Sequence, residues 1–150
     1  MAYGVKIFEI MGRHPLVVSA TATVYSALGK MLKSKSGFVL VVDKSKNLIG
    51  MLTEGTLLKD VLYKCKDPKK LKVKDVMIRK IITISPEKDI NEAMKMFEKK
   101  KIRKLPVVDG SGKLVGVVTV EMIANVDKGL MDVMIEKLKM LKPSFRIGGK

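Results

Sequence analysis

The sequence predicts an α+β (α/β) fold built from two tandem β-α-β-β-α repeats and a C-terminal helix. A shift of 66 positions aligns residues 41–43 with residues 107–109, and the register holds for more than 50 residues without a gap. Because chance rarely preserves register over that length, the shift indicates an internal duplication. The stretch 104–119 shows the pattern best, with a strand, a glycine-rich turn and a second strand that ends at Thr119.

The second copy opens with residues 81–84, a short β-branched run that predicts a strand. Asp89 then fits a helix N-cap, and Glu92 three residues later fits a capping box. The apolar stripe of this helix consists of Ile90, Ala93, Met94 and Phe97. After the two strands of the 104–119 stretch, a short helix is expected at about residues 120–126.

The first copy repeats these elements in a less regular form. Residues 16–18 predict the first strand, and Thr23 fits the cap of the next helix. That helix has a stripe made of Val24, Ala27, Leu28 and Met31. Two strands are expected at residues 38–42 and 48–52, followed by a closing helix at 56–63.

These elements divide the chain into repeat 1 at residues 5–63 and repeat 2 at residues 72–126. The polar stretch 64–71, which contains a proline, is expected to be a solvated linker. An amphipathic helix is predicted at residues 128–142, and the Gly- and Lys-rich end, 143–150, is expected to be flexible. Neither repeat is large enough to bury both faces of its sheet, so we expect the two to pack together as a pseudo-two-fold pair.

Composition indicates a soluble cytoplasmic protein. The chain has 150 residues, of which 47% are hydrophobic, and this excludes disorder throughout. It has no apolar run near the roughly 20 residues that span a bilayer. Lys6, Glu9 and Arg13 interrupt the region where a signal peptide needs an apolar core. Cys65 is the single cysteine and cannot form an internal disulfide.

The formal net charge of +15 is the most extreme feature of the composition. Lysines crowd residues 64–80, residues 99–104 and the last fourteen positions. A basic face attracts nucleic acid, nucleotides or an anionic membrane. The alternative is a lysine-rich surface of the kind found in thermophile proteins, although Glu does not keep pace with Lys here. Charge alone leaves both interpretations open.

The second copy closely resembles a CBS motif, the repeat first named from cystathionine β-synthase, in the stretch VKDVM…ITISPEKDINEAMKMFEKKKIRKLPVVDGSGKLVGVVT. The first copy is similar in IFEIM…VVSATATVYSALGKML…VLVVDKSKNLIGMLT. Two such motifs in tandem look like a CBS pair, also called a Bateman module, and the resemblance covers about residues 5–126. It implies two clefts between the repeats that bind AMP, ADP, ATP or S-adenosylmethionine.

In the family pattern, a Gly-h-h-Thr/Ser-x-x-Asp sequence follows the last strand. Its hydroxyl approaches a phosphate at a helix start, where free N–H groups favour an anion, and its Asp holds the ribose. By position, the resemblance assigns the phosphate role to Thr53 and Thr119. The Asp position is Thr56 in the first copy and Met122 in the second, so both depart from the pattern. Thr56 still offers a hydroxyl, whereas Met122 is a weak acceptor.

The resemblance also implies that each cleft borrows residues from the other repeat. The Thr53 cleft would be completed by Ile82, Ile102 and Arg103, with Lys104 beside them and the Met51 backbone near the base. The Thr119 cleft would be completed by Leu16, Ser36 and Gly37, with Val117 near the base. We favour the Thr53 cleft, because an unpaired ribose group costs about 1–3 kcal/mol. The alternative is that both threonines only cap the helices that follow.

The resemblance therefore implies a stand-alone regulatory module, not an enzyme, that binds an adenine nucleotide and reports it to an unidentified protein partner. A homodimer through the C-terminal helix is expected, and the alternative is that this helix packs back on its own module. His14 and Cys65 alone make no metal site, so neither a metal nor a resident cofactor is predicted. The alternative function is nucleic-acid binding through the lysine faces, although only seven aromatics argue against sequence-specific single-strand recognition.

Overall fold

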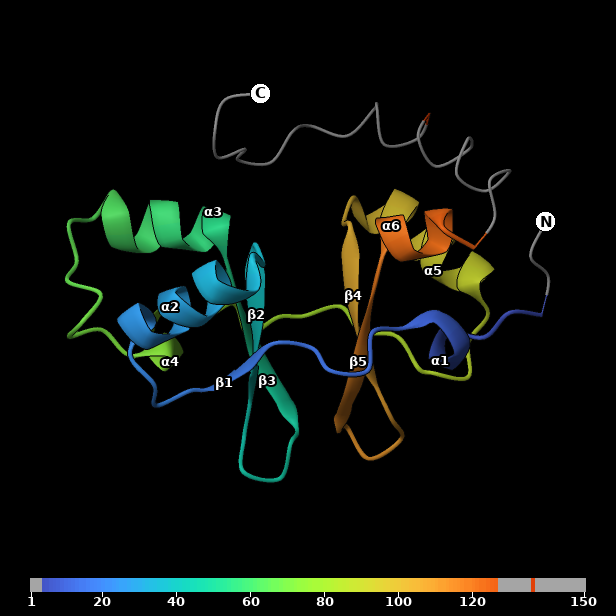
Figure 1. Ribbon diagram of the computed structural model, residues 1–150, viewed down its shortest axis with the longest axis horizontal. Helices are drawn as coiled ribbons and strands as arrows, with labels where there is room; N and C mark the ends of the chain where they lie inside the picture. The colour runs from blue at the N-terminus through green and yellow to red at the C-terminus, as the bar shows by residue number, and fades with distance from the viewer. Residues whose placement is uncertain (1–3, 127–135, 137–150) are drawn as a thin grey trace. The chain divides into compact units, whose positions relative to one another are not determined.

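The structure is a computed structural model of the chain, and it describes residues 4–126 and residue 136 (Figure 1). The described residues form two compact units. The first-repeat unit contains residues 15–81, and the second-repeat unit combines residues 4–14 with residues 82–126. Apart from Glu136, the predicted C-terminal helix at 128–142 and the tail at 143–150 lie outside the described residues.

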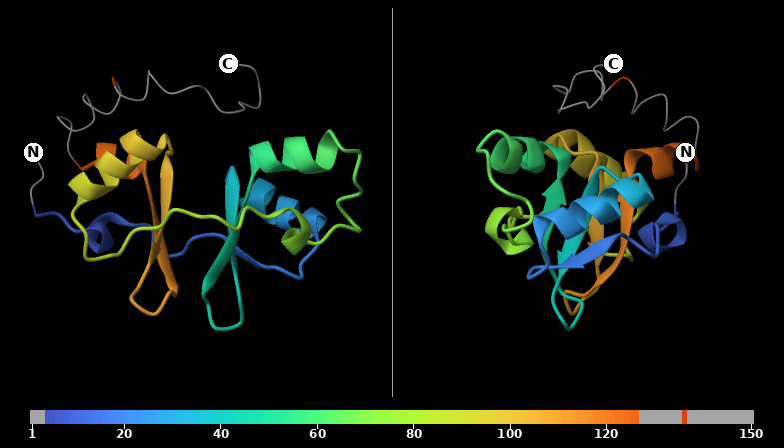
Figure 2. Two further views of the ribbon diagram at one scale, coloured as in Figure 1. Left: turned by 180° about the vertical axis from the view of Figure 1, so that it is seen from behind. Right: turned by 60° about the vertical axis from the view of Figure 1, so that its left-hand side comes forward.

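The first-repeat unit is built on a mixed sheet in the order β1-β2-β3. The strands are β1 (Val17–Ser19), β2 (Phe38–Val42) and β3 (Leu48–Thr53), with β1 parallel to β2 and β3 antiparallel to it. The helical segments are α2 (Val24–Ser34), α3 (Glu54–Thr56), the π-helix η1 (Leu57–Leu62) and α4 (Val73–Val76). Figures 1 and 2 show α2 and α3 on the same side of this sheet.

The predicted stripe of α2 forms the core of this unit. Thr23 caps the helix by accepting a hydrogen bond from the Ser26 backbone N–H at 3.1 Å. Its buried side chains are Val24, Ala27 and Met31, and they belong to one cluster with Val39, Val41, Leu52, Val73 and Met77. Two members of this cluster, Val73 and Met77, come from the first residues of repeat 2.

The second-repeat unit is built on the antiparallel pair β4 (Lys104–Val108) and β5 (Leu114–Thr119). Its helices are α1 (Ile7–Ile10), α5 (Ile90–Lys100) and α6 (Val120–Ala124), which lie on one side of the strand pair in Figure 2. The predicted stripe of α5 packs in a core whose largest buried side chain is Phe97. The mixture of helices and strands confirms the predicted α+β class.

Equivalent hydrogen bonds recur in the two units at the 66-residue shift. In the first-repeat unit, Met51 exchanges both backbone bonds with Ile78, at 2.9 and 2.8 Å. In the second-repeat unit, Val117 does the same with Gly12, at 3.0 and 2.9 Å. The leading segment of each repeat, residues 5–14 in repeat 1 and residues 72–81 in repeat 2, is therefore bonded into the unit that contains the strands of the other repeat.

Glycines at strand positions permit this close approach. A Cβ atom on Gly50 would lie 2.4 Å from the sulfur of Met77. A Cβ atom on Gly116, the equivalent residue, would lie 2.7 Å from both the Gly12 carbonyl oxygen and the Met11 sulfur. Because real side chains essentially never approach so closely, the Gly12 backbone can pack here only against glycine, whereas at Gly50 the Met77 side chain would have to move.

The strand predicted at residues 81–84 is wrong in extent, because the structure has a single parallel bridge there, between Ile84 and Val107. The reason lies in the partner strand. In the first-repeat unit the Leu40 N–H donates to the Leu16 carbonyl at 3.0 Å. The residue equivalent to Leu40 is Pro106, which has no N–H to give to the carbonyl of Ile82.

The closing helix of repeat 1 also differs from the prediction. A helix was expected at residues 56–63, but α3 begins at Glu54 and passes into the π-helix η1. Its wider turn is seen in the bond from the Tyr63 N–H to the Leu58 carbonyl at 2.9 Å. Cys65 ends the segment with a left-handed backbone, φ 54°. No local propensity distinguishes such a turn from an ordinary helix.

Candidate functional site

Thr53 and Thr119, the predicted phosphate residues, lie at equivalent junctions between a strand and a helix. Thr53 ends β3 and caps α3, and its hydroxyl accepts from the Thr56 N–H at 3.2 Å. Thr119 ends β5 and caps α6, and its hydroxyl accepts from the Met122 N–H at 3.3 Å. Both hydroxyls therefore cap the helices that follow, as the alternative interpretation of the sequence predicts. The Thr119 hydroxyl keeps its proton for a further contact, whereas the Thr53 hydroxyl donates its proton to the Thr56 hydroxyl oxygen and keeps one lone pair.

The two junctions differ in the residue three positions after the threonine. In the first-repeat unit, the Thr53 hydroxyl lies 3.2 Å from the Thr56 hydroxyl, and Thr56 is only 9% exposed. In the second-repeat unit, Met122 packs its methyl group against the leading segment, 3.3 Å from where a Cβ on Gly12 would lie. The first junction thus presents two coupled hydroxyls, and the second presents one hydroxyl beside a thioether.

A carboxylate lies beside the first junction. The Glu54 N–H donates to the Gly37 carbonyl at 3.1 Å, and a Cβ on Gly37 would lie 2.9 Å from a carboxylate oxygen of Glu54. Ser36, next to it, donates its hydroxyl to the Phe38 carbonyl at 2.6 Å. Ser36 and Gly37 were assigned to the Thr119 cleft, and the structure places them in the same unit as Thr53.

At the second junction, β-sheet register brings a cation next to Thr119. Lys104 is the cross-strand partner of Thr119, and the Arg103 carbonyl accepts from the Val120 N–H at 3.1 Å. The Arg103 guanidinium makes an ion pair with Glu121 at 3.3 Å, and both side chains are exposed. An exposed pair of this kind is worth at most about 1 kcal/mol, so a phosphate can displace the carboxylate at little cost.

The residues predicted near the base use much of their backbone elsewhere. Met51 and Val117 each have both backbone groups bonded to a leading segment, so only the second lone pair of each carbonyl is left for a base. Ile102 donates its N–H to the Phe97 carbonyl at 3.2 Å and packs against the core of its unit. Leu16 and Ile82 likewise pack against the core of their own units.

The structure thus groups the predicted residues by unit. The first-repeat unit holds Leu16, Ser36, Gly37, Met51, Thr53 and Thr56. The second-repeat unit holds Ile82, Ile102, Arg103, Lys104, Val117, Thr119 and Met122. Each predicted cleft draws on both sets, and this pairing stays a prediction.

Sequence reasoning missed the two carboxylates, Glu54 and Glu121. Each lies in the first turn of a helix, where an acid is ordinary because it complements the helix dipole. Their contacts with Gly37 and Arg103 depend on strand pairing. A search for an acid within one turn of each junction threonine would have found both.

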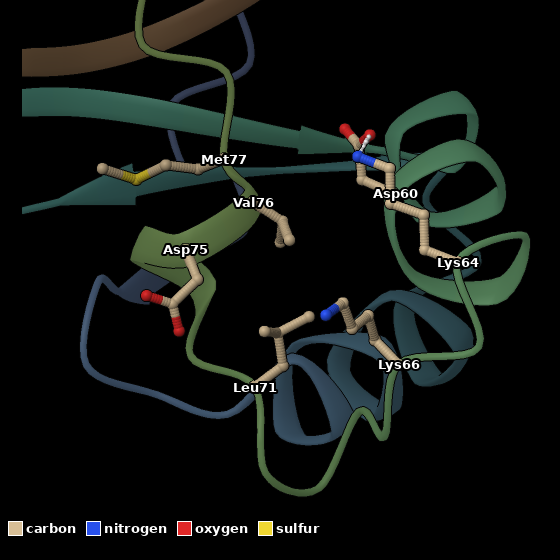
Figure 3. Close-up of a pocket in the computed structure, with 7 residues that line it drawn as sticks. All are labelled: Asp60, Lys64, Lys66, Leu71, Asp75, Val76 and Met77. Carbon is tan, nitrogen blue, oxygen red and sulfur yellow. Dashed lines mark ion pairs between the residues drawn. The ribbon is translucent and has the colours of Figure 1, made fainter.

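A pocket of about 410 Å³ lies in the first-repeat unit, and none of its lining residues is a predicted nucleotide residue (Figure 3). It is lined by Asp60, Lys64, Lys66, Leu71, Asp75, Val76 and Met77. Figure 3 shows Asp60, Lys64 and Lys66 on one side of it and Asp75, Val76 and Met77 on the other. Sequence reasoning treated residues 64–71 only as a linker.

Other site types find no support in the part of the chain that the structure describes. Among residues 4–126, no group of three His, Cys, Asp or Glu side chains is placed to hold a metal ion. Cys65 is an exposed free thiol. Within the same range, every helix is too short or too polar to cross a membrane.

Comparison with known proteins identifies the repeats. The family model described as CBS domain matches the chain twice, at residues 7–63 and 73–129. A curated relative, an uncharacterized protein of Methanopyrus kandleri, is 33% identical over 135 residues, which cover 90% of this chain and 69% of the relative.

Two solved structures are similar in fold. One is CBSX2, an Arabidopsis thaliana CBS-pair protein, in complex with AMP, with a TM-score of 0.72 and 23% identity over 85% of this chain and 99% of that one. The other is the CBS domain pair of protein MJ0100 in complex with 5-methylthioadenosine and S-adenosyl-L-methionine, with a TM-score of 0.71 and 23% identity over 81% of this chain and 98% of that one. On the strength of the two family-model matches, this chain belongs to the CBS domain family and carries a pair of its repeats.

Proposed function

We propose that this protein is a regulatory module, not an enzyme, that binds an adenosine-containing ligand such as AMP, ADP, ATP or S-adenosylmethionine. The observation that carries the proposal is the pair of threonine hydroxyls at equivalent strand–helix junctions, in positions that match the family's phosphate-binding pattern. The complexes of CBSX2 with AMP and of the MJ0100 pair with S-adenosyl-L-methionine support this class of ligand.

The first-repeat junction is the better candidate. Thr53 and Thr56 give two hydroxyls in contact at 3.2 Å, whereas the equivalent of Thr56 is a methionine packed against Gly12. A ribose needs an acceptor for its hydroxyls, and leaving one unpaired costs about 1–3 kcal/mol. Arg103 and Lys104 would then supply positive charge to the phosphate from the second-repeat unit.

Binding would regulate a partner by favouring one arrangement of the two repeats. A ligand shifts such an equilibrium only by its difference in affinity for the two arrangements. The net charge of +15 raises the local concentration of an anionic ligand. The regulated protein, and a homodimer of this chain, are part of the same proposal.

Isothermal titration calorimetry of the full chain with AMP, ATP and S-adenosylmethionine tests the proposal. We expect saturable heat with at least one of them, and guanosine monophosphate as the control should give less. Absence of heat with all three adenosine ligands at low salt would remove the nucleotide function.

A further inference from the structure

Residues 64–74, here called the basic segment, are not used by the proposed nucleotide site. The sequence KCKDPKKLKVK contains six lysines and one aspartate, and all six lysines are exposed. Its single acid, Asp67, accepts a hydrogen bond from the Lys69 N–H at 2.9 Å and so is used to shape the turn. In Figure 1 residues 64–72 form the green loop that leads to α4, and Val73 and Lys74 begin that helix.

The positive charge of the basic segment is mostly uncompensated. Among the described residues, Lys64 is the one lysine of the segment with an ion pair, to Asp60 at 3.2 Å. The Lys69 ammonium lies 5.0 Å from the centroid of the Tyr25 ring. No described carboxylate lies within 4.0 Å of the ammonium groups of Lys66, Lys70, Lys72 and Lys74.

The charge also argues against a second copy of this chain as the partner of the basic segment. The first-repeat unit has fourteen lysines and arginines against five aspartates and glutamates, a net charge of +9. The described residues of the second-repeat unit have ten against seven, a net charge of +3. Because both units are positive, self-association through the basic segment would place like charges together, and the surface fits a polyanion.

Exposed aromatic rings accompany the lysines. Tyr63 immediately precedes the basic segment and is 86% exposed, and Tyr25, beneath Lys69, is 55% exposed. Protein surfaces that bind single-stranded nucleic acid combine aromatic rings with lysines, because bases stack on the rings while ammonium groups neutralise phosphates. An acidic protein segment needs no ring and is matched better by arginine, whose fork binds a carboxylate through two bonds.

The pocket in Figure 3 lies at the same place and is lined by both charged and apolar residues. Its volume of about 410 Å³ falls in the range of small-ligand pockets, and Leu71, Val76 and Met77 line it. Its acids have partners, since Asp60 pairs with Lys64 and Asp75 accepts from the Lys72 N–H at 2.9 Å. A nucleotide, whose base has an apolar face and polar edges and whose phosphate could lie beside Lys66, fits this mixed lining.

We propose that the basic segment, with Tyr25, Tyr63 and this pocket, is a docking surface for single-stranded nucleic acid. The lysines contact phosphates as point charges, and the tyrosines stack on bases of any kind. Binding is therefore insensitive to sequence and steeply dependent on salt. This function is independent of the adenosine ligand.

Fluorescence anisotropy of the full chain with a labelled oligouridylate of about 20 nucleotides tests the proposal, across roughly 50 to 200 mM KCl. The test variant is Lys66→Gln, Lys69→Gln and Lys70→Gln together. The matched control, Lys95→Gln, Lys99→Gln and Lys100→Gln, removes the same charge from the exposed face of α5. We expect the test variant to lose at least about tenfold in affinity and about 2 from the slope of log K against log salt, and the control to change little.

Two further measurements separate nucleic acid from other polyanions. Tyr63→Ala should weaken binding at least about fivefold by loss of stacking. Leu62→Ala, at a neighbouring residue that is 70% exposed, should have no effect. The proposal is overturned by no binding at the lowest salt, by equal losses in the two lysine variants, or by polyglutamate displacing the probe as well as unlabelled oligouridylate does at equal charge.

Discussion

Asp89 joins two backbone segments of the second-repeat unit, the start of α5 and the segment at Gly4, through one carboxylate. It caps α5 by accepting from the Asn91 N–H at 2.8 Å, and it accepts from the Gly4 N–H at 2.9 Å. The bond from the Asn91 backbone is the main cause that lowers the pKa of Asp89, with further help from Gly4, the Asn91 side chain and the charge of Lys6, while desolvation opposes them. The ionised form is therefore the one that the fold stabilises.

The lowered pKa of Asp89 determines how the free energy of unfolding depends on pH. Because the pKa of Asp89 is lower in the folded chain, its stabilisation is present above the unfolded pKa and is lost as the pH falls through the folded one. Asp89→Ala should lower the free energy of unfolding by about 1 kcal/mol at neutral pH, and the difference from the parent should shrink below about pH 4. Urea unfolding across pH measures it.

Asp89→Ser is the control, because it keeps a capping oxygen without a titrating charge. Its stability relative to Asp89→Ala should not change with pH in this range. A difference between the parent and Asp89→Ala that stays constant down to about pH 3 would contradict the account.

Capping residues could be predicted from the sequence because a cap is a local interaction. Thr23 and Asp89 cap the expected helices, and Thr53 and Thr119 lie at the expected junctions. The expected capping box was less accurate, since Glu92 gives its own N–H to the Asp89 carbonyl at 2.9 Å.

At the scale of elements, the contact between each leading segment and a strand depends on one glycine. A side chain on Gly116 meets the Gly12 backbone, which cannot move without breaking its bonds to Val117. A side chain on Gly50 meets only the Met77 side chain. Gly116→Ala should therefore cost about 1–3 kcal/mol of unfolding free energy, and Gly50→Ala should cost less.

Gly29, inside α2, is the control, because nothing lies within 4 Å of a Cβ placed there. Gly29→Ala should stabilise the chain by about 0.5–1 kcal/mol through helix propensity. The packing argument fails if urea midpoints show Gly116→Ala to be no less stable than Gly50→Ala.

The shortened strand at residues 81–84 makes a second prediction for an element. Pro106→Ala restores an N–H opposite the Ile82 carbonyl, at the position where Leu40 bonds Leu16 at 3.0 Å. The new amide at position 106 should therefore exchange with deuterium about as slowly as the Leu40 amide of the same sample. Exchange at the rate of an unstructured loop would show that the proline is not the cause.

Most elements follow from periodicity, and the exceptions have physical reasons. The strands β2 and β4 and the helices α2 and α5 follow from apolar patterns that one face of a strand or helix imposes. The loss of the 81–84 strand follows from Pro106, and the 66-residue shift already aligns this proline with Leu40 in the sequence. The π-helix η1 has no such signal, because its residues are ordinary helix formers.

At the scale of the whole molecule, the sequence repeats and the compact units are not the same segments. The repeats run in order along the chain, but residues 72–81 pack with repeat 1 and residues 4–14 pack with repeat 2. A repeat found by alignment cannot reveal this exchange, because bonds such as Gly12 to Val117 join residues far apart in the chain.

The exchange predicts which fragment of the chain folds. A fragment of residues 15–81 retains Val73 and Met77, which are 0% and 8% exposed, whereas a fragment of residues 1–71 lacks both. Each buried side chain of this kind contributes about 1.5–3 kcal/mol, so the first fragment should unfold at higher urea concentration. Circular dichroism measures both, and equal or reversed midpoints would contradict the exchange.

Part of the candidate site could be predicted from the sequence, and part depends on contacts between residues far apart in the chain. The junction threonines and the substitution of the family's Asp by Thr56 and Met122 follow from sequence position. The contacts of Glu54 with Gly37 and of Arg103 with Glu121 required paired strands. The pairing of residues from the two units in one cleft remains a prediction.

Calorimetry with two matched variants tests the central claim most directly. Thr53→Val and Thr119→Val each remove a capping hydroxyl from an equivalent junction. Thr53→Val also removes the partner of the Thr56 hydroxyl, so urea unfolding of both variants measures the difference in structural cost. With the adenosine ligand that the parent binds most tightly, Thr53→Val should lose about tenfold or more in affinity, the value of a hydrogen bond to a charged group, and Thr119→Val less than about threefold. Equal losses, or a greater loss in Thr119→Val, would contradict the assignment of the ligand to the first-repeat junction.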